Sequence, residues 1–90
     1  MNNPRRKEIR AIIAQLEEIK DEIDSLTTDL EGLKEEEDEY RDNMPENMQA
    51  GERYEKACTA CDNLESALEW LTSISGDLES AICSAEDACD

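Results

Sequence analysis

Residues 9–40 read IRAIIAQLEEIKDEIDSLTTDLEGLKEEEDEY, and apolar side chains recur in this stretch at alternating intervals of three and four residues. The repeating positions, with one charged member, are Ile9, Ile12, Leu16, Ile19, Ile23, Leu26, Leu30, Leu33, Glu37 and Tyr40. Side chains three and four residues apart lie on one face of an α-helix, and a stripe this narrow is typical of a coiled coil. We therefore expect one long helix that packs its stripe against another helix.

A second repeat with the same spacing follows residue 52. Its positions are Tyr54, Ala57, Cys61, Leu64, Leu68, Leu71, Ser75, Leu78, Ile82, Ala85 and Cys89. Pro45 and Gly51 fall between the two repeats, where the chain should reverse. The sequence therefore predicts a single all-α domain over residues 1–90, an antiparallel helical hairpin and coiled coil. Its expected parts are a helix over residues 4–42, a turn over residues 43–51 and a helix over residues 52–89.

Charges at the helix ends favour the antiparallel pairing. Basic residues at positions 5–7 and 10 open the first helix, and acidic residues 35–39 lie near its end, so the helix dipole disfavours both groups. In the hairpin, the basic start would lie beside the acidic end of the second helix. A turn centred on Asn47 would place Lys20 beside Ile74.

One hairpin of 90 residues buries too little surface to be stable alone. We therefore expect it to form a homodimer, which would be a four-helix bundle. A second apolar ridge on the second helix carries Trp70, Ala67 and Ile74, flanked by Ala60 and Ala81. Tryptophan is enriched in binding hot spots. The ridge is interpreted either as the homodimer seam or as a docking site for another protein, and both interpretations require contact at Trp70.

The composition is strongly acidic, with 25 Asp and Glu against 9 Lys and Arg and a formal net charge of −16. Such a charge repels nucleic acid and anionic lipid and favours basic partners. No apolar run is long enough to span a membrane, and the first residues lack the apolar core of a signal peptide. We therefore expect a cytoplasmic protein that binds neither nucleic acid nor membranes directly.

The densest acidic cluster includes Glu35, Glu36, Asp38 and Glu39. Closely spaced carboxylates on a rigid helix can mimic the phosphates of a nucleic acid, and they steer a protein quickly to a basic groove. The plain alternative is a solvated helix face that keeps the protein soluble. Both interpretations remain open from the sequence.

A catalytic role is not expected. Residues 17–22 have an E-E-x-x-D spacing similar to that of helical magnesium-dependent nucleotide pyrophosphatases, which point these carboxylates into a bundle core. Here Leu16, Ile19 and Ile23 occupy the predicted core and turn the acids outward. Histidine is absent, which excludes a histidine-containing catalytic triad.

The cysteines are not expected to hold a metal. Cys58 and Cys61 have C-x-x-C spacing inside a predicted helix, and Cys83 lies about 33 Å further along at 1.5 Å per residue. We interpret them as free thiols, mainly small packing residues, and we expect no metal and no cofactor.

Residues 41–57 read RDNMPENMQAGERYEKA. This turn resembles that of a family of small, acidic helical-hairpin proteins carried by phages and mobile elements of Gram-positive gut bacteria, in which it typically reads D-N-M-P-E-N-L-Q-x-S-E-R-Y-E. Gly51 stands where the family has Ser, so the second helix lacks a hydroxyl cap. The resemblance implies a helical hairpin in a phage or mobile-element setting. Small acidic proteins of that setting are often inhibitors of host nucleases, so an inhibitory role is suggested here by analogy with them.

These observations predict a non-catalytic, acidic protein-binding module. As an inhibitor, it would occupy a basic nucleic-acid-binding groove of a host protein and so act as a DNA mimic. The alternative is a structural coiled-coil module that only self-associates or pairs with another helical protein.

Overall fold

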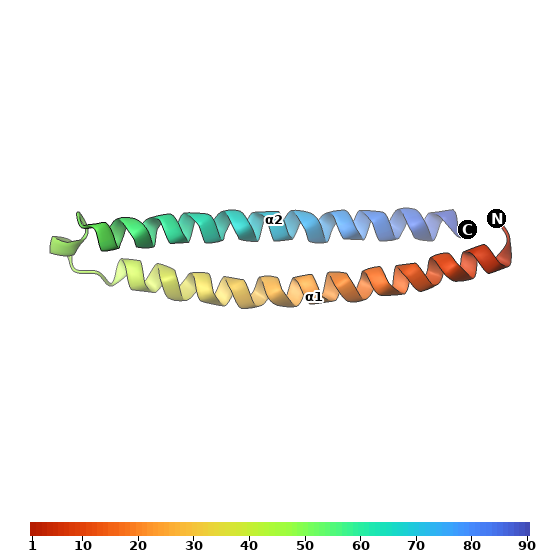
Figure 1. Cartoon of the computed structure of the whole chain (residues 1–90), viewed down its shortest axis with the longest axis horizontal. Helices are drawn as coiled ribbons and strands as arrows, with labels where there is room; N and C mark the ends of the chain where they lie inside the picture. Colours follow the sequence, from red (N-terminus) through yellow and green to blue (C-terminus); the bar gives the residue numbers. More distant parts are fainter.

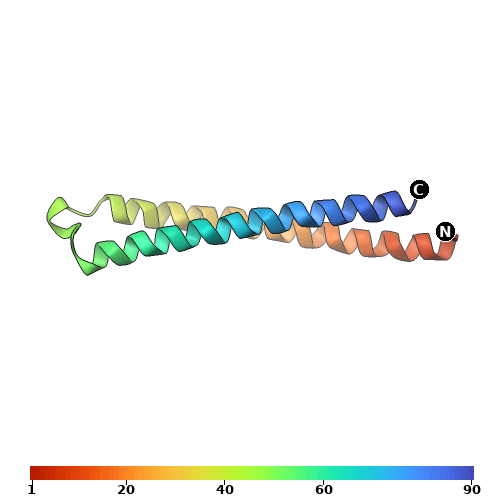
Figure 2. The same ribbon diagram turned by 90° about the horizontal axis from the view of Figure 1, so that it is seen from above.

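The computed structural model describes all 90 residues as two long helices that pack side by side (Figure 1). Helix α1 spans Asn3–Asp42, the short 3-10 helix η1 spans Glu46–Met48, and helix α2 spans Glu52–Ala88. The molecule is a rod of 70 × 15 × 14 Å, and both termini lie at the same end of it (Figures 1 and 2). The predicted antiparallel helical hairpin is therefore confirmed, with helix ends within one residue of those expected.

Local sequence explains where α1 begins. The Asn2 side chain accepts a hydrogen bond from the backbone N–H of Arg5 at 2.9 Å, and Pro4 occupies the first turn. An Asn cap satisfies an N–H that has no partner within the helix, and proline is tolerated there because its own N–H would be unpaired.

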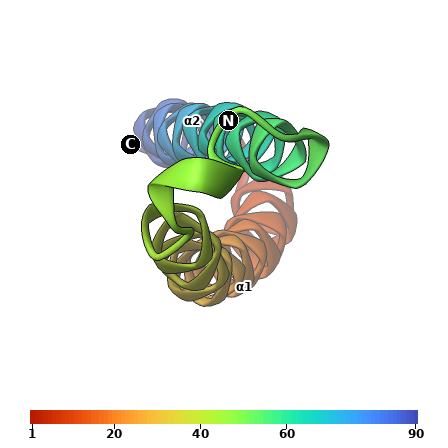
Figure 3. The same ribbon diagram turned by 90° about the vertical axis from the view of Figure 1, so that its left-hand side faces the viewer.

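The turn closes one end of the rod (Figure 3). Met44 is buried there, and the Gln49 side chain donates a hydrogen bond to the Met44 carbonyl at 3.3 Å. Gly51 caps α2 without a side-chain hydrogen bond, and a Cβ at this position would lie 3.2 Å from the Met48 carbonyl oxygen. Glycine therefore fits a corner in which a side chain would be crowded.

On α2, every position of the predicted stripe from Tyr54 to Cys89 is buried or half-buried. On α1, the covered positions at seam spacing are Arg6, Ile9, Ile13, Leu16, Lys20, Ile23, Thr27, Leu30, Lys34, Glu37 and Arg41, and Asp24 and Asp38 beside them are half-buried as well. The expectation for α1 was therefore half wrong. The five positions that were expected in the seam but are exposed are Ile12, Ile19, Leu26, Leu33 and Tyr40.

The reason lies in the side chains that replace them. Lys20, Lys34 and Arg41 are each only about a quarter exposed, because their aliphatic stems lie against the partner helix while their charged ends reach carboxylates. Long cationic side chains can cover apolar surface in this way. Helix α2 thus covers half of the α1 stripe together with the aliphatic parts of the lysine and arginine side chains beside it.

The register also differs from the expectation. Lys20 Nζ lies 3.5 Å from a carboxylate oxygen of Glu79, five residues beyond the expected neighbour Ile74. The turn residues extend beside the start of α2, so α2 begins beyond the end of α1 (Figure 1). A turn that overhangs one helix shifts the pairing of the whole hairpin.

Candidate binding surfaces

Five large apolar side chains of α1 form an exposed row. Ile12, Ile19, Leu26, Leu33 and Tyr40 are spaced seven residues apart and are 45 to 58% exposed. A seven-residue spacing keeps side chains on one line of a supercoiled helix. The row therefore forms a continuous apolar line along α1.

Two cross-helix contacts show on which side of the hairpin this row lies. The Ser75 hydroxyl donates a hydrogen bond to Asp24 at 2.6 Å, and Lys20 pairs with Glu79. Asp24 follows the seam residue Lys20 by four positions, and Glu79 follows the seam residue Ser75 by four positions. In antiparallel helices, both therefore lie on the same flank of the seam. Leu26 instead precedes the seam residue Leu30 by four positions, which places it on the opposite flank.

The second helix adds small residues to that opposite flank. Ile74 precedes the seam residue Leu78 by four positions, as Leu26 precedes Leu30, so Ile74 lies on the same side as Leu26. The positions at seven-residue spacing from Ile74 are Ala60, Ala67 and Ala81. We call the five exposed α1 residues and these four α2 residues the apolar face. It has large side chains on α1 and mainly small side chains on α2.

Trp70 lies at the outer edge of the apolar face. It follows Ala67 by three positions and precedes Ile74 by four, and it is 71% exposed, more than any other large apolar residue. Trp70, Ile74 and Ala67, the three α2 residues predicted to bind a partner, therefore lie together. The sequence did not indicate that the exposed α1 row would lie beside them.

The acidic residues predicted to bind a partner divide into two groups. Glu35, Glu36 and Glu39 are exposed, whereas Asp38 is half-buried and accepts a hydrogen bond from Lys34 at 2.9 Å. This hydrogen bond, and one with the Cys61 thiol, lower the pKa of Asp38. Asp38 therefore belongs to the seam, and the other three carboxylates are free to meet a basic partner.

Asp38 also sets the chemistry of Cys61, which is only 2% exposed. Burial, and then the neighbouring Asp38 carboxylate, raise the pKa of this thiol to about 11. A thiol is nucleophilic only as a thiolate, so Cys61 is an unreactive packing residue at neutral pH. All four cysteines are free thiols.

A second polar cluster, which the sequence did not reveal, joins the helices near their middle. Asp24 accepts hydrogen bonds from Ser75 at 2.6 Å and from Lys20 at 2.9 Å. The Ser75 hydrogen bond, followed by that of Lys20, lowers the pKa of Asp24. The only signal in the sequence was a polar Ser75 inside an otherwise apolar stripe.

The acids of the pyrophosphatase-like spacing do not converge. Glu17, Glu18, Asp21 and Glu22 are all exposed. Nowhere in the chain do three His, Cys, Asp or Glu side chains come together in a group that could hold a metal ion.

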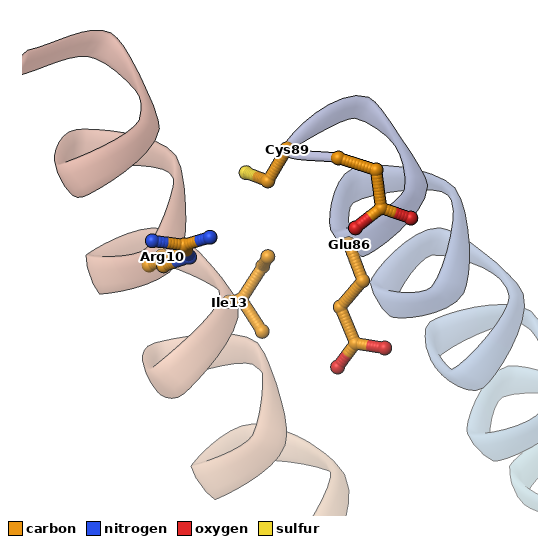
Figure 4. A pocket seen from close by; sticks show the side chains of 5 residues that line it. Arg10, Ile13, Glu86 and Cys89 are labelled. Carbon is orange, nitrogen blue, oxygen red and sulfur yellow. The ribbon is translucent and has the colours of Figure 1, made fainter. Parts of the chain in front are cut away.

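A shallow hollow of about 320 Å³ lies where the two helix ends meet (Figure 4). Arg10 and Ile13 line it from α1, and Glu86, Cys89 and Asp90 line it from the other end of the chain. Nearby, Arg6 Nε donates a hydrogen bond to the Cys89 carbonyl at 3.1 Å. The basic start of α1 therefore lies beside the acidic end of the chain, as expected, and its one hydrogen bond across the hairpin is to a backbone carbonyl.

Neither helix contains a segment apolar enough to cross a membrane. No protein-family model matches the sequence, and no curated protein and no solved structure is significantly similar to it.

Proposed function

We propose that this chain is a non-catalytic, acidic protein-binding module of phage or mobile-element origin that acts in the cytoplasm as a dimeric four-helix bundle. The observation that carries the proposal is the apolar face, which the hairpin leaves uncovered along α1. Contiguous exposed apolar surface of this kind marks protein interaction sites on soluble proteins. The strongly acidic remainder of the surface favours a basic partner over nucleic acid or membranes.

As its binding activity, we propose that the module inhibits a host protein by occupying its basic nucleic-acid-binding groove. Glu35, Glu36 and Glu39 support this role because they are exposed on one rigid helix with no ion pair to hold them. Dense carboxylates at fixed spacing can take the place of phosphates, and their field accelerates association with a basic surface.

The test is capture of host proteins by the immobilised full chain at low and high salt. The triple variant E35Q, E36Q, E39Q should lose the captured protein, and binding of the unchanged chain should weaken steeply with salt. The matched control E17Q, E18Q, E22Q removes three exposed carboxylates elsewhere on α1 and should keep binding. Salt-independent capture by both variants would exclude groove occupancy.

The second candidate is a structural module that only self-associates or pairs with another helical protein. The apolar face favours it, because a seven-residue apolar row is the surface that coiled-coil helices use to pair. This role predicts association that tolerates salt and weakens in the Trp70→Ala variant, whereas loss of Glu35, Glu36 and Glu39 should have no effect. Salt-sensitive association that survives Trp70→Ala would contradict it.

A further inference from the structure

We propose that a second copy of this chain covers the apolar face, with each α1 packed against α2 of the other copy and both turns at the same end of the bundle. This inference rests on the proposed dimer and adds the surface, the pairing and the orientation. The two-fold axis would run along the rod between the two hairpins.

The hairpin by itself leaves its apolar residues poorly covered. Only six residues are buried, and none of them is a fully buried large side chain. Meanwhile the five large side chains of α1 stand 45 to 58% exposed in one line. A second hairpin is long enough to cover the whole row, because the row spans about 42 Å at 1.5 Å per residue and the rod is 70 Å long.

The sizes of the side chains select which helices meet. The contacts of Lys20 with Glu79 and of Asp24 with Ser75 place residues 19 and 26 level with residues close to 80 and 73. A two-fold axis along the rod would therefore set Ile19 against Ala81 of the partner subunit. Facing rows of large and small side chains interdigitate, so this pairing fills the space between the hairpins.

The reverse orientation, with turns at opposite ends, packs less well. It would set each α1 against the same helix of the other copy, so the large row would meet the large row and the alanine row would meet the alanine row. Unequal gaps of this kind leave voids beside the small residues, and cores tolerate voids poorly.

The ends of the helices support a second copy as the occupant. In the proposed bundle, the basic start of α1 at positions 5–7 and 10 meets the acidic end of the other copy's second helix. The start of each α1 thus has an oppositely charged neighbour both within its own hairpin and across the dimer. Trp70, at the edge of the face, would lie over α1 of the second copy.

Sedimentation equilibrium of the full chain over a range of concentrations tests the contact surface. Leu26→Glu should raise the dimer dissociation constant by about 100-fold or more, since it places a charge in the centre of a buried row. Ser25→Glu adds the same charge on the exposed outer side of α1 and should leave the constant within about threefold. Equal effects of the two variants would overturn the proposed face.

A second variant separates loss of contact from loss of folding. Ala81 is exposed in the single hairpin, so Ala81→Leu leaves room for the hairpin to fold. In the proposed bundle, the larger leucine side chain overfills the α2 row of Ala60, Ala67, Ile74 and Ala81. It should weaken dimerisation about tenfold, with unchanged helix content by circular dichroism. Ser80→Leu, on the outer side of α2, should have little effect. A tighter dimer in Ala81→Leu would contradict the pairing of large with small rows.

Energy transfer between N-terminal labels tests the orientation. Amine-reactive donor and acceptor dyes can be directed to the N-terminal amino group of Met1 by labelling at neutral pH. Mixed donor-labelled and acceptor-labelled chains should show efficient transfer that an excess of unlabelled chain removes. Dimers without transfer would overturn the orientation while the dimer stands, because opposite orientations separate the N-termini by nearly the 70 Å length of the rod. A protein that stays monomeric at all concentrations would overturn the dimer and this inference together.

Discussion

At the scale of single residues, polar side chains inside the seam define how the two helices meet. Asp24 and Asp38 each accept a hydrogen bond from a lysine four positions earlier, and Asp24 also accepts one from Ser75 of α2. A directional hydrogen bond between the helices adds a preference for one register to that given by apolar packing and by the turn. These contacts therefore support the observed register of the hairpin.

The Asp24 cluster predicts a pH-dependent contribution to stability. Hydrogen bonds lower the pKa of Asp24 below its usual value of 3.8 in the folded state. The contribution is therefore complete above the unfolded pKa and is lost as the pH falls through the folded pKa. Asp24→Asn should lower the free energy of unfolding at neutral pH, and the difference from the unchanged chain should shrink below pH 3.8.

Urea denaturation followed by circular dichroism at a series of pH values measures this difference. Asp21→Asn is the matched control, because Asp21 is exposed and makes no ion pair. A difference between Asp24→Asn and the unchanged chain that persists in strong acid would show that the carboxylate does not act through its charge.

At the scale of elements, the seven-residue repeats account for the lengths of both helices. Gly32 in α1 and Gly76 in α2 fall between repeat positions and do not end their helices. Packing along the seam therefore outweighs the low helix propensity of glycine.

Gly76→Ala should stabilise the hairpin by about 0.5–1 kcal/mol, because alanine restricts the unfolded chain and has the higher helix propensity. A Cβ at Gly76 meets nothing within 4 Å, so the folded chain accepts it without strain. Thermal unfolding by circular dichroism gives the change in stability.

Gly51→Ala is the informative comparison, since its Cβ would lie 3.2 Å from the Met48 carbonyl oxygen and alanine is a poor N-cap. We expect this variant to be destabilised. An equal gain in stability from both substitutions would mean that the close approach in the turn is not present in solution.

At the scale of the whole molecule, charge opposes folding while the seam favours it. A net charge of −16 on a rod only about 15 Å across repels itself along the whole length, and the dimer doubles this charge. The cross-helix ion pair of Lys20 with Glu79 offsets little of this repulsion because Glu79 is largely exposed.

Added salt should therefore raise the melting temperature. Screening shortens the range of the repulsion from about 30 Å at 0.01 M salt to about 3 Å at 1 M. The melting temperature measured at these two concentrations should be higher in the second, and sodium and potassium chloride should act alike because screening depends on ionic strength. A fall in melting temperature with salt would mean that attractive ion pairs outweigh the repulsion.

The sequence alone determined the all-α class, the two helices, the position of the turn and the whole α2 side of the seam. These follow from local rules, because the spacing of apolar residues defines a helical stripe and Pro45 interrupts it. The same rules placed Trp70, Ala67 and Ile74 on one ridge. They also grouped Asp38 with Glu35, Glu36 and Glu39, although only the three glutamates are exposed and Asp38 is paired with Lys34.

Only the tertiary structure decided which half of the α1 stripe faces α2, and at what register. The row that begins with Ile9 can be covered together with the row of Ile12 or with the row of Ile13, Lys20 and Lys34, so the choice depends on the surface of α2 and on the cationic stems that can share the seam. That choice leaves Ile12, Leu26 and their row uncovered beside the α2 alanines. The binding surface thus results from the packing of the two helices, and the residue spacing within either helix alone does not predict it.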